Sequence, residues 1–399
     1  SKLKEMLDKI IEAYEERKTL KTEYEQKRSE QNSFNEQMSK TEKGSDEFNK
    51  LIGTLKELSV KVKEIEEKLK TKDEELRSLL EVLPNIPDED VPAGGKEKNE
   101  VVKVVGKKPE FSFKIKDHVA LGENLNVLDL ERASKISGSN FWMYKDKLAQ
   151  LEWALLNYFI KSHLEDGYHM IMPPHLVTEE SAYTAGQLPK FKEDVYWVTD
   201  GDCLIPTAET VLANIHRGEI LEERELPKKY FAYTPCYRRE AGSYRANERG
   251  IIRVHQFDKV EMFQYTTPEK SAEALEELVG KAEKLVQGLG LHYRVTKLAA
   301  EDCSAGAAKT FDIEVWIPSL NTYYEVSSAS NVKDYQARRG DIRYKPTDGS
   351  KTRYVHMLNA SGLATSRLMV SILESYQNED GSITVPEILV PFTGFDKIG

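Results

Sequence analysis

Residues Pro235–Phe263 read PCYRREAGSYRANERGIIRVHQFDKVEMF, and this stretch predicts two strands joined by a loop. Arg238 and Glu240 stand two positions apart, so on a strand their side chains would share one face. A charged loop from Gly242 to Gly250 follows. The chain then returns with a second alternating set, namely Arg253, His255, Phe257, Lys259 and Glu261.

This pattern indicates a binding site for a polyanion that carries a flat base. A guanidinium can fork onto a phosphate, an aromatic ring can stack on a purine, and carboxylates can hold an amine. The alternative is a hairpin with one solvated face. That alternative fits poorly, because solvated faces rarely combine Arg-x-Glu and His-Gln-Phe with buried-type apolar alternation.

The stretch resembles motif 2 of class II aminoacyl-tRNA synthetases in the form found in seryl-tRNA synthetases, whose pattern is approximately CFRSEAG…RGLIRVHQFDKVE. The resemblance covers nearly the whole chain and continues through Thr207–Glu209, Glu325–Ser328 and Asn359–Arg367. The chain departs from the family pattern at several places, among them Ala300–Ala305 and Ala360, both expected near the amino-acid pocket.

The resemblance implies an α+β fold, with an antiparallel-sheet class II catalytic domain over residues 111–399. It implies ATP- and Mg²⁺-dependent activation of L-serine to seryl-adenylate, followed by transfer to the 3′ end of tRNA(Ser). Whether tRNA(Sec) is also charged stays open. So do two alternatives: a paralogue with another amino-acid or carrier specificity, and a non-catalytic RNA-binding protein on a synthetase scaffold.

The resemblance also implies roles for individual residues. Arg238 would clamp the α-phosphate, Glu240 would hold the adenine amine and Arg367 would grip the γ-phosphate, and these three are the expected catalytic residues. The expected ATP-binding set is Arg238, Arg239, Glu240, Arg253, Val254, Phe257, Glu325, Val326, Ser327, Ser328 and Arg367. The expected serine-binding set is Thr207, Ala208, Glu209, Arg238, Glu261, Asn359 and Ser361. Glu325 and Ser328 offer oxygen ligands suited to Mg²⁺; a strand-end carboxylate in water is the alternative.

Residues 1–82 predict a helical hairpin. In the second half, apolar residues follow the alternating spacing of a coiled coil, at Leu51, Leu55, Leu58, Val62, Ile65, Leu69, Leu76 and Leu79. The first half has Leu3, Leu7, Ile10 and Tyr14, and then polar Arg17, Lys21 and Arg28. Thr41–Asp46 predicts a turn followed by a helix N-cap, which disfavours the alternative of a parallel dimerising coiled coil. The resemblance implies a tRNA-binding arm, with phosphate contacts from Arg17, Lys18, Lys21, Lys27 and Arg28.

Residues 83–110 are rich in Pro and Gly and predict a linker. Residues 141–164 predict a long helix that leads into a strand over 168–174, which fits class II motif 1 and its family role in a homodimer interface. Strands are predicted over 191–199, 203–205, 293–298, 311–316 and 323–326, and helices over 270–291 and 360–377. Because helices and strands segregate, an antiparallel sheet flanked by helices is expected.

Composition limits the cellular setting. The 399-residue chain has a formal net charge of −10, which argues against DNA or bulk RNA as an electrostatic partner but allows local basic patches. It has no apolar run near the ~20 residues of a membrane span. The three cysteines, Cys203, Cys236 and Cys303, indicate a reducing compartment, so a cytoplasmic location is expected. No zinc-type ligand spacing is present. The family pattern has further residues before the position of Ser1, and whether the N-terminus is trimmed stays open.

Overall fold

The computed structural model describes residues 2–240 and 249–399. The chain divides into two compact units, Ser1–Leu83 and Pro84–Gly399. Residues 241–248, which make up most of the charged loop predicted between Gly242 and Gly250, lie outside the described residues.

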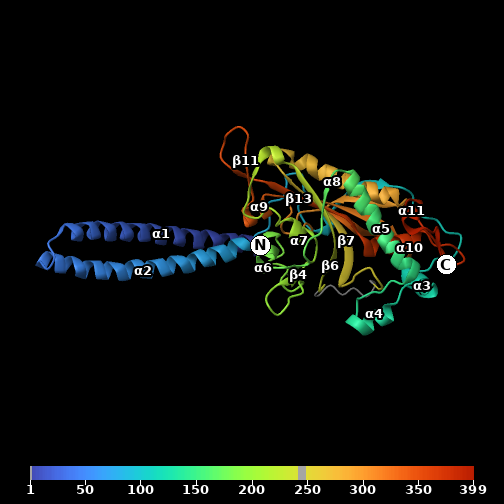
Figure 1. Cartoon of the computed structure of the whole chain (residues 1–399), viewed down its shortest axis with the longest axis horizontal. Helices are drawn as coiled ribbons and strands as arrows, with labels where there is room; N and C mark the ends of the chain where they lie inside the picture. Colours follow the sequence, from blue (N-terminus) through green and yellow to red (C-terminus); the bar gives the residue numbers. More distant parts are fainter. Residues whose placement is uncertain (1, 241–248) are drawn as a thin grey trace. The chain divides into compact units, whose positions relative to one another are not determined.

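The first unit is an antiparallel pair of helices, α1 (Lys2–Lys40) and α2 (Asp46–Glu81), as Figure 1 shows. Ser45 caps α2, because its hydroxyl accepts a hydrogen bond from the backbone N–H of Phe48 at 3.1 Å. The hairpin, its turn and its N-cap are therefore confirmed. Leu58, Val62 and Ile65 of the predicted seam are buried against α1.

The register predicted for α1 was wrong. Leu7 and Tyr14 are 42% and 49% exposed. The less exposed positions of α1 instead keep a 4–3 spacing, at Met6, Ile10, Ala13, Arg17, Leu20, Tyr24, Lys27, Gln31, Phe34 and Met38. Polar residues in this seam find partners, since Arg17 Nε donates to Asp73 Oδ1 of α2 at 2.6 Å. Lys72, which interrupts the seam of α2, pairs with Glu16 and Glu75, both at 2.6 Å.

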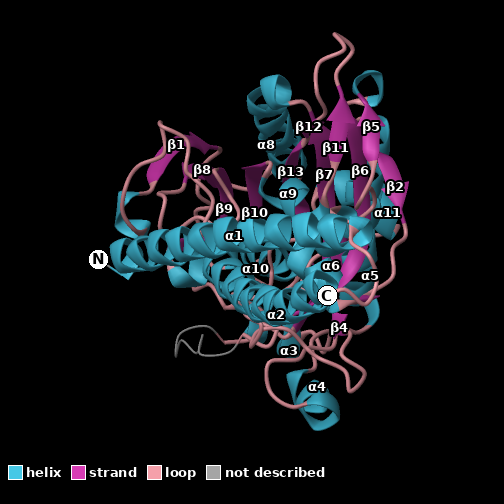
Figure 2. Cartoon of the chain, turned by 90° about the vertical axis from the view of Figure 1, so that its left-hand side faces the viewer, coloured by secondary structure: helices cyan, strands magenta, loops and turns pink. Residues whose placement is uncertain are grey.

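The second unit contains an eight-stranded sheet in the order β1-β8-β9-β10-β13-β7-β6-β2, which runs from one edge to the other in Figure 2. Every neighbouring pair is antiparallel except β2 and β6. The predicted antiparallel α+β sheet is therefore confirmed. Its strands are β1 (Glu100–Val105), β2 (His169–Ile171), β6 (Lys228–Tyr237), β7 (Gln256–Thr266), β8 (Tyr293–Lys297), β9 (Lys309–Ile317), β10 (Thr322–Lys333) and β13 (His356–Ala364).

Helices cover one face of this sheet, and short strands lie around it. The helices α5 (Asp146–Glu165), α8 (Ser271–Gly288) and α10 (Thr365–Ser375) pack against it and form the main hydrophobic core. The remaining helices are α3 (His118–Asn124), α4 (Leu130–Ser137), α6 (Glu179–Thr184), α7 (Glu209–Leu212), α9 (Tyr335–Gly340) and α11 (Val390–Thr393). The remaining strands are β3 (Leu176–Val177), β4 (Cys203–Leu204), β5 (Ile220–Glu222), β11 (Arg343–Lys345), β12 (Arg353–Tyr354), β14 (Ile383–Thr384) and β15 (Lys397–Ile398).

The two faces of the sheet differ because successive side chains alternate. On β7, Val260 and Met262 enter the helix-covered core, whereas Lys259 and Glu261 lie on the opposite face. On β13, Ala360 belongs to the core, and Asn359 and Ser361 lie on the same face as Glu261, with Ser361 paired to it across the strands. This second face therefore carries the polar residues of the predicted site.

Four predictions of local structure were wrong. Residues 83–110 are not all linker, because Glu100–Val105 form β1 and pair with β8 at the edge of the main sheet. Residues 191–199 form turns with one isolated bridge, Trp197 to Cys203, and not a strand. Residues 356–364 form β13, so the helix predicted from 360 begins only at Thr365. Glu325 and Ser328 lie within the twelve residues of β10 and not at a strand end.

No helix among residues 2–240 and 249–399 is both long and apolar enough to cross a membrane.

Candidate functional site

Arg238 lies just beyond the end of β6, over an aromatic ring of the neighbouring strand. Its guanidinium carbon is 5.1 Å from the centre of the Phe257 ring, and its Nε donates to the carbonyl oxygen of Pro206 at 3.3 Å. The strand pairing continues through one further contact, because the backbone N–H of Arg238 donates to the carbonyl of His255 at 2.9 Å. The antiparallel pair β6–β7 thus places a cation and a flat ring together.

Glu240 is held by Arg253 and not by strand geometry. β6 ends at Tyr237, and Glu240 has a positive φ of 50°, so the predicted i, i+2 strand relationship with Arg238 was wrong. Arg253 precedes β7 and donates from Nη1 to Glu240 Oε2 at 2.5 Å. Both side chains, with Arg238 and Phe257, nevertheless line one cavity.

Arg367 enters the same region from α10. Its Nη1 donates to the carbonyl oxygen of Glu325 at 3.1 Å and approaches Glu325 Oε2 at 3.4 Å, and its Nε donates to Ile252 at 3.2 Å. These contacts tie the first turns of α10 to β10 and to the segment before β7. The predicted position of Arg367 inside a helix is confirmed, although β13 and not a helix leads into it.

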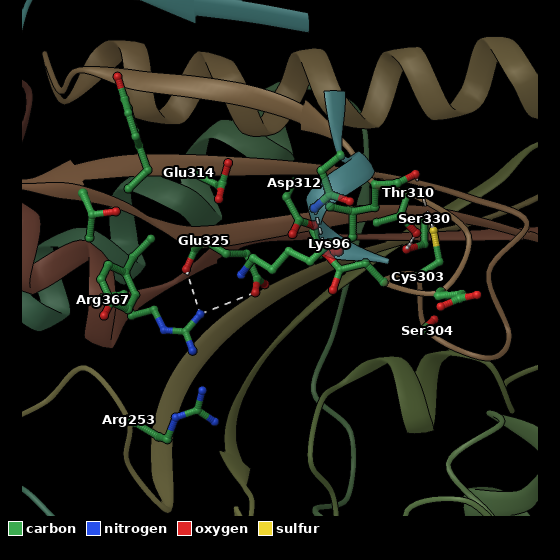
Figure 3. A pocket seen from close by; sticks show the side chains of 18 of the residues that line it. Lys96, Arg253, Cys303, Ser304, Thr310, Asp312, Glu314, Glu325, Ser330 and Arg367 are labelled. Atoms are coloured by element: carbon green, nitrogen blue, oxygen red, sulfur yellow. Dashed lines mark hydrogen bonds and ion pairs between the residues drawn. The ribbon is translucent and has the colours of Figure 1, made fainter. Parts of the chain in front are cut away.

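A larger cavity of about 660 Å³ continues from these residues across β9 and β10. In Figure 3, Arg253 and Arg367 lie at one end and Cys303, Ser304 and Thr310 at the other, with Asp312 and Glu325 between them. Lys96 and Asn99, from the segment directly before β1, also line it. The cavity therefore offers two guanidinium groups followed by carboxylates.

The carboxylates at the middle of this cavity offer oxygen ligands for a cation. Ser328 pairs with Asp312 across β10 and β9, and both line the cavity with Glu325. Asp312 Oδ1 is buried without a hydrogen-bond partner among the described residues. Burial, and then the charge of Glu325, raise the pKa of Asp312 well above its usual range. Two carboxylates and a hydroxyl, with the Asp312 Oδ1 atom lacking a hydrogen-bond partner among the described residues, are the kind of oxygen ligands that a divalent cation takes.

A cluster of buried polar side chains adjoins Arg238 on the same sheet face. Lys259 Nζ donates to Thr207 Oγ1 at 2.7 Å and forms an ion pair with Glu261, and Thr207 Oγ1 also donates to Glu261 Oε2 at 3.3 Å. Lys259 is 5% and Glu261 1% exposed. The ammonium and the carboxylate are therefore buried and paired with each other, and removing either partner would leave an uncompensated buried charge.

Glu209 completes this cluster from the start of α7. Its Oε1 accepts hydrogen bonds from Gln336 Nε2 at 2.7 Å and from Asn359 Nδ2 at 3.0 Å. Burial, reinforced by the charge of Glu261, raises the pKa of Glu209 to about 7. Glu209 therefore changes charge near neutral pH.

Of the remaining predicted residues, some line the cavity of Arg238 and others lie in the core or the sheet. Val254 lines the cavity of Arg238, but the Arg239 guanidinium lies 5.8 Å from the centre of the Tyr196 ring. Ala208 is fully buried as the residue before α7, and Val326 enters the core. The Ser327 hydroxyl donates to the Ser361 carbonyl at 2.6 Å, so it acts within the sheet.

Sequence reasoning missed Lys259, Asp312 and Gln336. Lys259 stood in the alternating set with Phe257 and Glu261, which was the available signal. Asp312 was a carboxylate inside an apolar strand, and Gln336 had no local signal. Ala360 packs in the core with its side chain away from Ser361, so this departure does not alter the pocket lining.

The basic residues predicted on the arm fall into two groups. Arg17 and Lys27 are partly buried, and Arg17 is engaged with Asp73. Lys18, Lys21 and Arg28 are exposed and have local partners at Glu15, Glu25 and Gln31, respectively.

Comparisons with known proteins agree with this geometry. Residues 1–87 match the model of the seryl-tRNA synthetase N-terminal domain, and residues 196–376 match that of the tRNA synthetase class II core domain (G, H, P, S and T). Serine–tRNA ligase 2 of Clostridium acetobutylicum is 56% identical over 98% of this chain and 93% of its own length. The serine–tRNA ligase of Petrotoga mobilis is 51% identical over 99% of this chain and 94% of its own length. The crystal structure of seryl-tRNA synthetase from Pyrococcus horikoshii complexed with ATP superposes with a TM-score of 0.92 at 35% identity, covering 98% of this chain and 92% of that one.

Proposed function

Because the chain belongs to the seryl-tRNA synthetase family, as Pro235–Phe263 predicted, we propose that it activates L-serine with ATP and transfers it to tRNA(Ser). The observation that carries this proposal is the position of Arg238. Its guanidinium lies over Phe257, in the cavity that also contains Glu240 and Arg367, and it adjoins the Lys259–Glu261 cluster. One cation would thus contact both the nucleotide and the amino acid.

The first step would join the two substrates without covalent help from the protein. A serine carboxylate oxygen attacks the α-phosphorus of ATP, pyrophosphate leaves, and seryl-adenylate forms. Arg238 would orient the carboxylate and the α-phosphate together. Arg253 and Arg367 would neutralise the leaving phosphates, and the Phe257 ring would stack on adenine. Placement and fixed charge account for catalysis of this kind.

The Glu240 carboxylate would recognise adenine by accepting a hydrogen bond from the exocyclic amine of the base. In the free protein this carboxylate is held by Arg253 at 2.5 Å, so ATP binding would exchange one partner for another. Arg253 would then be released toward the phosphates. The assigned ATP-binding residues are those of the sequence prediction, and Arg239 fits the set least well because it lies against Tyr196.

Mg²⁺ would be held by Glu325 and Ser328, and Asp312 offers a third oxygen ligand beside them. When bound, the ion supplies charge that offsets the negative phosphates. Glu325 Oε2 lies 3.4 Å from Arg367 Nη1. The Glu325 carboxylate would therefore contact both the ion and the guanidinium that binds the phosphates.

Serine would bind with its ammonium toward Glu209 and its hydroxyl toward Glu261 and Thr207. A site built to hydrogen-bond a hydroxyl rejects an analogue without it by roughly 10⁴-fold or more, because buried polar groups are then left unpaired. Glu261 is 1% exposed, so an alanine substrate would leave this buried group of polar side chains with one hydrogen bond fewer than serine would. Asn359 and Ser361 would line the remaining wall.

The helical arm would bind tRNA through its exposed cations. Lys18, Lys21 and Arg28 are the best-suited phosphate contacts, and Arg17 and Lys27 would contribute only after giving up partners within the arm.

We further propose a homodimer formed by a second copy at the β2 edge. Trp153 and Leu164 of α5 and Met172 after β2 expose apolar side chains there, at 56%, 51% and 90%. Three unpaired cysteines support a cytoplasmic location.

Aminoacylation of tRNA tests the whole proposal. The purified chain is incubated with ATP, Mg²⁺, labelled serine and transcribed tRNA(Ser), with tRNA(Sec) and a tRNA with a short variable arm as comparators. We expect serine to be attached to tRNA(Ser) and not to the short-arm tRNA. Failure to charge tRNA(Ser) by a folded chain would contradict the proposal. Light scattering on the same sample measures whether the protein is dimeric.

A further inference from the structure

His163 is a buried histidine of α5 that contacts the site through one backbone group. Its side chain is fully buried, and Nε2 lies 3.0 Å from the carbonyl oxygen of Gly362 on β13. A carbonyl only accepts, so Nε2 carries the proton and donates. Burial lowers the pKa of His163 to about 4, so the ring is neutral at physiological pH. Nδ1 has no hydrogen-bond partner in the described part of the chain.

Gly362 lies in the bulge at the end of β13, directly before α10. Ser361 pairs with Glu261, and Ala364 pairs with Lys259, so β13 advances three residues where β7 advances two. This bulge ends the strand and redirects the chain into α10, which begins at Thr365. Ser361 before the bulge and Arg367 after it are both residues that line the cavity of Arg238.

Two hydrogen bonds hold successive carbonyls of this bulge. The Ser327 hydroxyl donates to the carbonyl of Ser361 at 2.6 Å, and His163 donates to that of Gly362 at 3.0 Å. The fit is close, since a Cβ on Gly362 would lie 2.3 Å from His163 Nε2 and 3.3 Å from the end of Met262. The imidazole therefore occupies the space that any larger residue at position 362 would need.

We propose that His163 is a positioning residue for the amino-acid pocket, acting through the Gly362 carbonyl to set the location of Ser361. This inference rests on the proposed serine activation. It assigns a role in the site to a residue of the opposite, helix-covered face of the sheet. Misplacement of a pocket group by about 1 Å can cost up to ~100-fold in rate, so a single backbone contact of this kind can matter.

Amino-acid-dependent ATP–pyrophosphate exchange tests the inference with two polar variants. In His163→Gln the side-chain amide nitrogen takes the place of Nε2, whereas in His163→Asn it is too short to reach Gly362. We expect the KM for serine to stay within about threefold of wild type in the Gln variant and to rise about tenfold or more in the Asn variant. The KM for ATP should change less, because Arg238 and Phe257 do not depend on this contact.

A control on the same strand separates positioning from general stability. His356 lies at the far end of β13, where its Nδ1 contacts the Ser271 hydroxyl at 2.9 Å. His356→Ala removes this contact and should lower the melting temperature without changing the KM for serine. A second test uses Gly362→Ala, which should impair serine use severely with His163 present and less severely in a His163→Ala background, where the Cβ has room.

The outcomes are distinct. Equal KM values for serine in wild type and His163→Asn, or equal losses in the Asn and Gln variants, would overturn the positioning role. Additive effects of Gly362→Ala and His163→Ala would also contradict it. Wild-type protein without serine-dependent exchange would instead contradict the proposed function itself.

Discussion

The guanidinium of Arg238 lies 5.1 Å from the centre of the Phe257 ring, beside the buried ion pair of Lys259 and Glu261. The β6–β7 pairing produces this relationship, because Cys236 pairs with Phe257 and Arg238 follows two residues later. Arg238 is consequently the group best placed to contact both substrates of an amino-acid activation reaction.

Replacement of Arg238 should abolish adenylate formation. We expect Arg238→Ala to lower the rate of ATP–pyrophosphate exchange by about 10³-fold or more, since a preorganised charge at the reacting phosphate is lost. Arg238→Lys keeps the positive charge but lacks the bidentate geometry of a guanidinium, so it should restore only a small part of the wild-type exchange rate. Substantial exchange by a folded Arg238→Ala variant would remove this residue from its assigned role. Arg343→Ala, in the separate β11–β12–β5 sheet, is the control and should retain wild-type exchange.

Serine binding should depend on pH through Glu209. Its pKa of about 7 means that the carboxylate is charged above neutrality and protonated below it. A neutral carboxyl cannot pair with the serine ammonium, so the KM for serine should rise as the pH falls from 8 to 6. The slope should approach tenfold per pH unit at the acid end. Glu209→Gln should show a high KM without this slope, and an unchanged slope would assign the titration to another group.

The arm should serve tRNA and not activation. Reversing the exposed cations in a Lys18→Glu, Lys21→Glu, Arg28→Glu variant should weaken tRNA charging and reduce its salt dependence, because phosphate contacts are lost. Deleting residues 12–74 should have a larger effect of the same kind. Exchange without tRNA should match wild type in both cases. Undiminished charging by the deletion variant would refute the proposed role of the arm.

Glu152 should make the protein less stable at high pH. Burial, reinforced by the charge of Asp258, raises the pKa of this α5 carboxyl to about 8. As the pH rises above the unfolded value near 4.5, the unfolded chain releases this proton while the folded protein retains it. Stability is therefore lost between about pH 4.5 and pH 8. The Glu152→Gln variant has no carboxyl to titrate here, so its free energy of unfolding should fall by about 2–4 kcal/mol less than that of wild type over this pH range.

Denaturant titrations at pH 5 and pH 8 measure this effect. The midpoint of the variant should exceed that of wild type at pH 8 and differ little from it at pH 5. A variant that is less stable at both values would show that the Glu152 carboxyl has a partner that stabilises its charge.

The alternation of Phe257, Lys259 and Glu261 was sufficient to predict β7 and the face that carries the site. Segregation of helix and strand patterns likewise predicted the antiparallel sheet. These signals are local, because the period of a strand is two residues and that of a helix is 3.6. Arg238 and Glu240 converge on one cavity for a different reason than strand spacing, since Glu240 has a positive φ and is held by Arg253.

The errors arose where tertiary contacts override local preference. Residues 360–377 were predicted as one helix, but residues 356–364 form β13, which pairs with β7 and β10. A bulge between Ser361 and Ala364 separates this strand from the helix that follows. In α1 the true seam contains Arg17 and Lys27, so polar residues concealed its spacing. Asp312 and Lys259 gained their significance from cross-strand neighbours that a single sequence does not reveal.

The most direct test of the central claim is amino-acid-dependent ATP–pyrophosphate exchange by the purified chain, with serine measured beside threonine, alanine, glycine and cysteine. The Lys259–Glu261–Thr207 cluster predicts exchange with serine and at least several hundredfold less with alanine, because the buried carboxylate would lose its hydroxyl partner. Preferential exchange with any of the other four amino acids, or none with serine from a folded protein, would contradict the account.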